Sequence, residues 1–452
     1  MDRKQPIWSD NIVIRKREPL NGDLSVEVAV IGAGITGILT AYFLQKAGKK
    51  VVVLEADRIG SGQTGKTTAK ITYQHGLCYH NLIQNVGKEE ALDYLTANRL
   101  AIDAYKHLIK EEGIECDFRI CDSYLYTIEN SGLLEKEEKA AVSLGIDAKF
   151  VKQTELPFSV KESLVYPGQA VFHPLKFISK LSEQLTIYED TRVEDIRESG
   201  VGAYRIKITS GAFVTAKEVV VACHYPFTIY PGYYFARMHQ ERSYVVALTG
   251  VSGNPIQNIY YGIDKGGYSF RQSGDYLLLG GAGHRTGENR QGGQYEQLFA
   301  AAKRFYPGSQ ISHYWSAQDC ITLDDIPYIG QFARGTKGVY VATGFKKWGM
   351  THAMAAARII SDEILWKEGG GGRVFRTGRF HTKVSIPKVL QEGGHSIKNL
   401  TIPNEPEKRR CSHMGCFLCK NPEEGTWDCP CHGSRFTKEG KVIDGPAKKS
   451  IK

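Results

Sequence analysis

The sequence has no apolar stretch long enough to cross a membrane. A spanning helix needs about 20 consecutive apolar residues, whereas the most apolar runs here, such as Val26 to Ile31, are short and strand-like. The segment from Met1 to Leu20 mixes charges with isolated apolar residues and never forms the apolar core of a secretion signal. These absences argue against export and against a transmembrane anchor, so we expect a soluble, cytoplasmic protein.

A concentrated basic patch is also missing. The 452 residues include 58 Lys and Arg against 49 Asp and Glu, but these basic residues are spread along the chain, with only a modest cluster from Lys408 to Arg410. Nucleic-acid binding requires basic residues gathered on one surface, so we expect no nucleic-acid partner. The net charge of +9 is more simply read as a mild attraction for acidic partners or anionic substrates. Low-complexity tracts are absent too, and a chain of this length is expected to form about two to four globular domains.

Cysteine is unevenly distributed. Five of the ten cysteines fall in the last 42 residues. In a chain expected to stay in the cytoplasm, such clustering indicates metal or redox chemistry rather than a disulfide scaffold. The clustered residues are Cys411, Cys416, Cys419, Cys429 and Cys431.

A strand, a glycine turn and a helix follow one another near the N-terminus. The apolar run from Val26 to Ile31 leads into Gly32-Ala-Gly34-Ile-Thr-Gly37, and apolar residues then recur at helical spacing. A second strand, Val51 to Leu54, closes with Glu55. In such a unit the first glycine makes the turn, the second lets backbone amides approach a pyrophosphate, and the third lets helix and strand pack closely. An acid at the end of the second strand accepts hydrogen bonds from a ribose, so the pattern predicts a dinucleotide site.

The next loop also matches the sequence pattern of the phosphate-binding loop of nucleoside triphosphatases. Gly60 to Thr67 matches GxxxxGK[ST], but four residues separate it from the preceding strand, which already serves the dinucleotide unit. A nucleoside triphosphatase is therefore disfavoured. We expect instead that the amides and hydroxyls of this loop, including those of Thr64 and Thr67, and the adjacent Thr68 contact the bound dinucleotide.

Two later strands favour FAD over NAD. Val219 to Ala222 ends in Cys223 and His224, and Gly338 to Gly344 leads to Gly349, Met350 and a helix from about Thr351 to Trp366. The chain here resembles the glycine/D-amino-acid oxidase-like (DAO) FAD oxidoreductases from about residue 10 to 366. That resemblance implies an α/β fold with a Rossmann-like FAD-binding domain and an inserted mixed-sheet substrate domain. It also implies that the N-terminus of the last helix faces the flavin, and that Ala222, Gly344, Gly349, Met350, Thr351 and the Val193 backbone contact the cofactor.

The same resemblance suggests candidates for the substrate site. Residues 268–272 and 276–280 flank Ser273-Gly274-Asp275 and predict a hairpin from which Arg271 projects. An Arg on this sheet commonly holds the substrate carboxylate in the family, so Arg271 is the first candidate, and His284 and Arg285 are the next. His224 is expected to overhang the flavin ring. A structural Arg and a buried, hydrogen-bonded His are the alternatives for these positions.

Two short motifs near the C-terminus point to an iron–sulfur cluster. Cys411-Ser-His413-Met-Gly-Cys416 and Cys429-Pro-Cys431-His432-Gly-Ser434 resemble the two ligand loops of Rieske [2Fe-2S] domains. The resemblance implies that the Cys411 and Cys429 thiolates hold one iron and the His413 and His432 imidazoles the other. It also implies a disulfide between Cys416 and Cys431. Zinc bound by the Cys416-Phe-Leu-Cys419 pair and later ligands is the alternative, although it leaves Cys411 and His413 unexplained.

The scaffold before the first ligand loop is short. Residues 398–410 give only a polar stretch where Rieske domains have several strands, so either this small all-β domain is abbreviated or the sequence is shortened. Gly369 to Gly372 are expected to stop the last helix of the FAD-binding domain, and the segment that follows them is a linker or docking arm. The expected domains are FAD-binding at 1–90, 165–225 and 320–368, substrate at 91–164 and 226–319, linker at 369–400, and Rieske at 401–452.

Together these patterns predict an FAD-dependent enzyme that oxidises an amine, an amino acid or a similar small donor. Electrons would pass from flavin through the cluster to a protein or quinone-like acceptor, which favours a dehydrogenase over an oxidase. An FAD oxidase with a vestigial cluster and a redox sensor or electron carrier are the alternatives.

Overall fold

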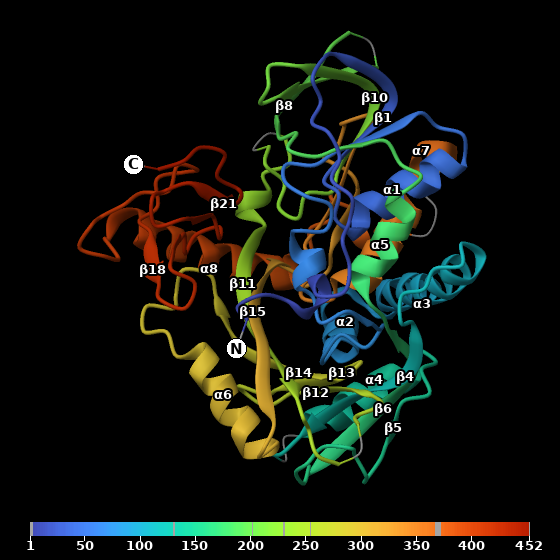
Figure 1. The fold of residues 1–452 in the computed structure, drawn as a ribbon, viewed down its shortest axis with the longest axis vertical. Helices are drawn as coiled ribbons and strands as arrows, with labels where there is room; N and C mark the ends of the chain where they lie inside the picture. Colours follow the sequence, from blue (N-terminus) through green and yellow to red (C-terminus); the bar gives the residue numbers. More distant parts are fainter. Residues whose placement is uncertain are drawn as a thin grey trace.

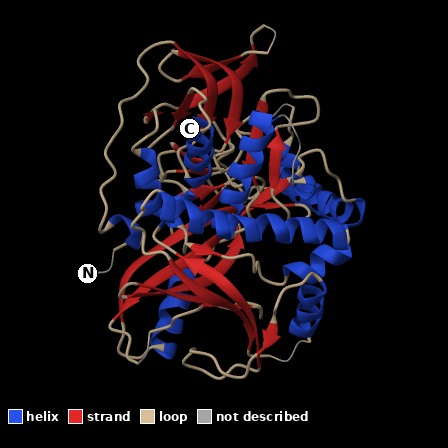
Figure 2. Cartoon of the chain, turned by 90° about the vertical axis from the view of Figure 1, so that its right-hand side faces the viewer, coloured by secondary structure: helices blue, strands red, loops and turns tan. Residues whose placement is uncertain are grey.

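The computed structural model describes residues 3–129, 132–200, 202–228, 231–253, 255–366 and 372–451. Two large sheets form most of the molecule, and a smaller C-terminal unit, residues 402–451, lies to one side of them (Figure 1). Figure 2 shows most of the helices in the band between the two sheets. Among the described residues, no helix is both long and apolar enough to cross a membrane.

The first sheet is built around parallel strands that begin near the N-terminus. Its strand order is β16-β17-β10-β1-β2-β7, and β8 and β9 continue it from β10. Strands β1, β2 and β17 are almost wholly apolar because this part of the sheet is buried on both faces. The bounds are β1 Leu24–Ile31, β2 Val51–Leu54, β7 Ile187–Tyr188, β8 Val193–Glu198, β9 Tyr204–Ile208, β10 Phe213–Val221, β16 Tyr328–Gln331 and β17 Val339–Thr343.

Helices cover the first sheet at the points that the sequence predicted. Helix α1, Ile35–Lys46, follows β1 directly, and α7, Gly349–Trp366, follows β17 and packs against α1. The predicted glycine stop at Gly369 to Gly372 lies outside the described residues, apart from Gly372. The other helices are α2 Cys78–Val86, α3 Lys88–Glu111, α4 Leu133–Ser143, α5 Pro174–Ser182 and α6 Gln294–Phe305.

The second sheet is mixed, as expected for a substrate domain. Its order is β15-β11-β14-β13-β12-β4-β6-β3, with β5 beside β6, and only β12 and β4 pair in parallel. The predicted hairpin is present as β13 and β14, in which Arg271 faces Leu278. The bounds are β3 Lys70–Ile71, β4 Arg119–Thr127, β5 Lys149–Phe150, β6 Glu162–Val171, β11 Met238–Thr249, β12 Ile259–Gly262, β13 Ser269–Ser273, β14 Tyr276–Arg285 and β15 Gln310–Thr322.

Some strands of this sheet run across the expected domain boundaries. Strand β3 follows directly from the loop expected to touch the cofactor, yet it pairs with β6 of the second sheet. Strand β15 pairs with β11 along its whole length and ends three residues inside the segment assigned to FAD binding. Segments assigned to FAD binding from sequence therefore contribute strands to the second sheet.

The C-terminal unit is a four-stranded antiparallel sheet. Its order is β18-β19-β20-β21, with bounds Cys419–Asn421, Thr426–Asp428, Arg435–Phe436 and Val442–Asp444. Its small core contains four of the clustered cysteines with Leu418, Trp427 and Phe436. The expected linker is largely a helix: α8, Thr382–Thr401, follows the short turn Arg373–Phe375 and runs into this unit.

Candidate flavin cavity and cluster site

A large cavity opens where the first sheet meets the second. Its volume is about 1750 Å³, and its walls come from both sheets and from the C-terminal unit. The predicted residues that line it are Gly32, Gly34, Glu55, Thr64, Thr67, Thr68, Val193, Ala222, His224, Gly344, Gly349 and Met350. Segments far apart in the sequence thus converge on one space, as the FAD prediction requires.

The glycine turn has the geometry that a pyrophosphate site needs. Gly32 has a φ of +105°, which side-chain-bearing residues rarely adopt. A Cβ on Gly34 would lie 3.2 Å from the Thr64 hydroxyl, so little room is left between the turn and the following loop. Gly37 does not line the cavity, and a Cβ there would lie 1.9 Å from the Gly32 carbonyl oxygen. Gly37 therefore lets α1 pack against β1, in keeping with its expected role.

The carboxylate of Glu55 is held at the end of β2. It accepts hydrogen bonds from the backbone amides of Ala33, at 2.6 Å, and Asp57, at 2.9 Å. Burial raises the pKa of Glu55, and the two amide donors oppose that shift. The acid thus faces the cavity from the place where a ribose is expected.

The loop from Gly60 to Thr67 does not form a triphosphate-binding loop. Such a loop opens an α-helix, but here the segment contains only a four-residue 3-10 turn, Gln63–Lys66. The Thr64 hydroxyl accepts a hydrogen bond from the Ile35 amide at 2.9 Å, so the loop folds back onto the start of α1. Its threonines consequently lie beside the dinucleotide turn.

Thr351 differs in position from the other residues predicted to contact the cofactor. Its hydroxyl lies 2.9 Å from the Thr72 amide and 2.8 Å from the Thr72 carbonyl oxygen. It does not line the cavity, whereas its neighbours Gly349 and Met350 do. Thr351 therefore fastens the first turn of α7 to the segment that directly follows β3.

Arg271 does not reach the cavity. Its guanidinium is buried and donates hydrogen bonds to the Ala69 carbonyl at 2.7 Å and to the Thr68 carbonyl at 2.5 Å, while it lies over the Trp8 ring. All of these partners are structural, so this geometry does not fit the predicted substrate clamp. A buried cation surrounded by carbonyls instead holds β13 against the turn before β3.

The other two predicted catalytic residues lie in different surroundings. His284 does not line the cavity. Its ring stacks on the Tyr244 ring, and its Nε2 forms a hydrogen bond with the Tyr244 hydroxyl at 3.0 Å. His284 therefore fits the structural alternative rather than the catalytic one. His224 lines the cavity and has a φ of +69°. Its Nε2 lies 3.5 Å from the Cys320 sulfur, and burial lowers the pKa of the imidazole.

The two predicted ligand loops bring four side chains together in the C-terminal unit. Cys411 and Cys429 are buried side by side, and their contact lowers the pKa of Cys411 to about 7 and raises that of Cys429. The His413 and His432 rings lie 5.1 Å apart, centroid to centroid, and both Nδ1 atoms are buried without a hydrogen-bond partner among the described residues. Two thiols and two unpaired imidazole nitrogens are the donor set that a Rieske cluster requires.

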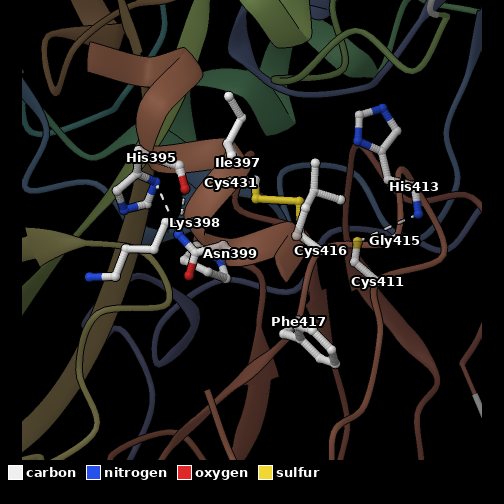
Figure 3. The surroundings of a disulfide bond; sticks show 12 residues. His395, Ile397, Lys398, Asn399, Cys411, His413, Gly415, Cys416, Phe417 and Cys431 are labelled. Carbon is white, nitrogen blue, oxygen red and sulfur yellow. Dashed lines mark hydrogen bonds between the residues drawn. A yellow bond between two sulfur atoms is a disulfide. The ribbon is translucent and has the colours of Figure 1, made fainter. Parts of the chain in front are cut away.

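A disulfide joins these two ligand loops. It links Cys416 and Cys431, and Figure 3 shows it between the loop that carries Cys411 and His413 and helix α8. The sulfurs of Cys416, Cys429 and Cys431 all lie within 4.8 Å of one another, and Cys419 belongs to no such group in the described part of the chain. Because the disulfide uses two of these three sulfurs, the zinc alternative lacks its ligands.

Comparison with known proteins identifies both parts of the chain. The model of the FAD dependent oxidoreductase (DAO) family matches residues 27–363. The chain belongs to this family. Residues 407–452 match the Rieske [2Fe-2S] domain, so the FAD-binding part and the cluster-binding part lie in one polypeptide.

Similar proteins agree with this division. YhfW of Bacillus subtilis (strain 168), named as a Rieske 2Fe-2S iron-sulfur protein, is 35% identical over 98% of this chain and 96% of its own length. Glycine oxidase from Geobacillus kaustophilus has a TM-score of 0.67 at 19% identity, covering 79% of this chain and 99% of that one. L-proline dehydrogenase from P. horikoshii has a TM-score of 0.64 at 17% identity, covering 79% and 98%. At these identities the two structures show a shared fold.

The Rieske unit of this FAD-dependent oxidoreductase forms part of the cavity wall. Residues 441–445, which include β21, line the same cavity as the glycine turn and the start of α7. The Asp444 carboxylate is half-buried there, and the nearby positive charges of Lys66 and Arg435 hold its pKa below the usual range against the effect of desolvation. The cavity is thus closed on one side by the domain that carries the cluster.

Sequence reasoning missed a charged wall on the second sheet. Glu241 on β11 and Asp319 on β15 are cross-strand neighbours that line the cavity. The Lys347 ammonium lies 2.9 Å from the Glu241 carboxylate, and burial raises the pKa of Asp319 to about 6. Neither strand shows a regular alternation of polar and apolar residues that would single these positions out, and only the fold brings them to one wall.

Proposed function

We propose that this chain oxidises an amino acid, an amine or a similar small donor at FAD and passes the electrons through its own Rieske cluster to a protein or quinone-like acceptor. The observation that carries the proposal is the shared cavity, because Gly32 and Gly349 of the FAD site and Asp444 of the Rieske unit line one space. When bound, FAD accepts a hydride from the donor, and the cluster carries electrons one at a time. A carrier of single electrons beside the flavin gives them a route other than oxygen, so we favour a dehydrogenase over an oxidase.

The charged wall supports a zwitterionic or cationic donor. Lys347 offers an ammonium to a carboxylate, and Asp319 and Glu241 offer carboxylates to a protonated amine. The structural neighbours are named for the oxidation of glycine and L-proline, which are amino acids that carry both charges. Because opposite charges held at fixed places orient a small molecule, this wall is suited to presenting a donor to the flavin.

His224 is retained as the candidate catalytic residue. It lines the cavity from the end of β10, and its lowered pKa keeps the imidazole neutral at pH 7. A neutral imidazole accepts a proton, which is what the release of an amine proton requires. Arg271 and His284 have structural partners instead and take no part in this proposal.

The proposal is tested first by metal analysis. Purified protein is expected to contain about two irons and one FAD per chain, and the dithionite-reduced protein to give the EPR spectrum of a Rieske cluster. Zinc, or no metal, would defeat the cluster assignment. Anaerobic mixing with a panel of amino acids and amines is then expected to bleach the flavin and reduce the cluster with at least one of them.

Two outcomes of the mixing experiment would favour other functions. Bleaching followed by rapid oxygen consumption, with the cluster left oxidised, would favour an oxidase. A flavin that no member of the panel bleaches would favour an electron carrier or redox sensor.

A further inference from the structure

The second cluster-binding loop, residues 429–434, contacts the second sheet directly, and this sheet is called the substrate sheet below. Gly433, in this loop, has a φ of +81°, and a Cβ on it would lie 2.6 Å from the side chain of Gln240 on β11. Similarly, a Cβ on Gly287, just after β14, would lie 2.5 Å from the backbone of Pro430. Both approaches are closer than any side chain allows, so the loop and the sheet fit together only with glycine at these two places.

Every carbonyl in the centre of this loop accepts a hydrogen bond from the sheet. Arg285 donates to the carbonyls of Pro430, at 3.1 Å, and Cys431, at 3.2 Å. Gln240 donates to the carbonyl of the cluster ligand His432 at 2.7 Å. The series is completed by Gln318 of β15, which donates to the Gly433 carbonyl at 2.8 Å. Four successive residues are therefore held by three side chains from another domain.

The two glutamine amides have no freedom to turn. Gln240 uses its second N–H on the Gly445 carbonyl, at 3.1 Å, and its oxygen accepts from Gln318 at 2.7 Å. The oxygen of Gln318 accepts from Arg242 and from Thr286, both at 3.2 Å. Because each amide has all its donors and its acceptor engaged, a flipped amide would set an oxygen against a carbonyl. Both side chains are 1% exposed, so no water competes for these bonds.

Among the described residues, the first cluster-binding loop makes no hydrogen bond to the sheet, and only the Phe235 ring, just before β11, packs against its His413. Its neighbours are in α8, where the Asn399 carbonyl accepts from the Phe417 amide at 2.8 Å, and it is tied to the second loop by the disulfide. Helix α8 is in turn fixed by Glu392, which forms an ion pair with Arg285. The second loop is therefore the direct mechanical link between the cluster and the wall of the flavin cavity.

We propose that Gln240 and Gln318, together with Arg285, are positioning residues that hold the Rieske cluster in a fixed seat on the substrate sheet during electron transfer. This inference rests on the proposed transfer from flavin to cluster and specifies how the chain achieves it without a moving domain. In such a transfer the cluster, held by Cys411, Cys429, His413 and His432, would accept one electron at a time and would pass each to the external acceptor, so two transfers would return the flavin to its oxidised state. A fixed seat makes the distance of that transfer constant.

The test uses the holoprotein with Gln240→Met and Gln318→Met, which keep side-chain volume and remove the amide. Gln272→Met on β13 is the matched control, because that amide is solvent-exposed and, among the described residues, donates to the Gly274 carbonyl of the same hairpin and to no other group. Hydrogen exchange followed by mass spectrometry measures the amides of residues 429–434. For Gln240→Met we expect exchange in this loop to accelerate about 100-fold, the order of magnitude that follows from losing the three buried hydrogen bonds of the Gln240 amide. The control is expected to match the wild type.

A second readout separates positioning from simple destabilisation. Blue light with EDTA reduces the bound flavin without any substrate, and freeze-quench EPR then follows the cluster. In Gln240→Met and Gln318→Met we expect unchanged flavin bleaching and unchanged g-values, but cluster reduction that lags behind the flavin. Wild-type exchange and wild-type cluster reduction in both variants would overturn the proposal.

The remaining outcomes are also decisive. If the wild-type flavin bleaches while the cluster stays oxidised, the proposed electron transfer fails, and the exchange measurement still decides whether the seat exists. If Gln240→Met does not fold, Gln318→Met alone is measured. Normal exchange with lost cluster signal in that variant would assign these residues to cluster retention and refute positioning.

Discussion

Three buried side chains beside the flavin cavity form a hydrogen-bonded chain that ends on a carbonyl at each side. His75 Nε2 lies 2.6 Å from the Thr72 carbonyl, and His75 Nδ1 lies 2.5 Å from the Tyr94 hydroxyl. The same hydroxyl lies 2.9 Å from His352 Nε2, and His352 Nδ1 lies 3.2 Å from the Phe345 carbonyl. Four hydrogen bonds need four protons, but two neutral imidazoles and one phenol supply only three. The chain therefore gains a hydrogen bond if it takes up one proton.

Burial opposes that uptake. It lowers the pKa of His352 to about 3 and that of His75 well below its usual range. In the unfolded chain the same imidazoles titrate near pH 6.5. Because the folded pKa lies below the unfolded one, this contribution to stability is complete above pH 6.5 and is lost as the pH falls towards 3. At pH 5, His352 alone should cost the folded protein about 2 kcal/mol.

The measurement compares melting midpoints of the holoprotein at pH 7 and pH 5. We expect the wild type to lose about 2 °C more than His352→Gln over this range, a shift scaled to the size of the chain. His107→Gln is the control, because His107 is exposed on α3 and should leave the difference unchanged. Taking the difference between two pH values removes the fixed cost of each substitution. If the wild type and His352→Gln lost the same amount, the fourth hydrogen bond would outweigh desolvation, and the reasoning would be refuted.

Two further substitutions test the cofactor sites. Gly37→Ala places a Cβ 1.9 Å from the Gly32 carbonyl oxygen, so the turn must open by about 1 Å. The overpacking costs about 1–3 kcal/mol and should weaken FAD binding about 10- to 100-fold. The flavin content of the purified protein measures this loss. Gly48→Ala, where nothing lies within 4 Å of the new Cβ, should lower the melting midpoint slightly and leave FAD bound, and equal flavin loss in both variants would contradict the argument. Cys416→Ser removes a disulfide that spans 15 residues, which the chain-entropy estimate values at about 3 kcal/mol. It should speed the loss of iron to a chelator without changing FAD content, and an unchanged rate would show that the two cluster-binding loops do not need the bridge.

Local patterns predicted the elements that are built from neighbouring residues. Strand β2 ends where Val51 to Leu54 indicated, and the hairpin around Gly274 is present, because alternation and turn residues act within a few positions. The donor set of the cluster was also readable, since each ligand loop is contiguous. These features need no knowledge of the rest of the fold.

Other features depend on contacts across the chain, and the sequence could not supply them. The family resemblance predicted that Arg271 holds a substrate carboxylate, but its partners at residues 68 and 69 lie some 200 positions earlier in the chain. Helix α8 lies in the segment interpreted as a linker or docking arm, and it contains Pro387, Gly393 and Gly394, which are poor helix formers. Its ion pair with Arg285 is a tertiary contact that outweighs this weak local preference.

The two cofactor sites therefore differ in how far apart in the sequence their residues lie. The FAD turn is specified by residues 32–68, where most positions contact their neighbours in the chain. The cluster seat draws on Gln240, Arg285, Gln318 and Gly433, which lie on three strands and one loop from two domains. A substitution in the turn is judged by local geometry alone, but one in the seat must be judged against partners far away in the sequence. A search for other oxidoreductases with a seated cluster should therefore look for paired buried amides on the strands equivalent to β11 and β15, because the Rieske motif by itself does not reveal where the cluster sits.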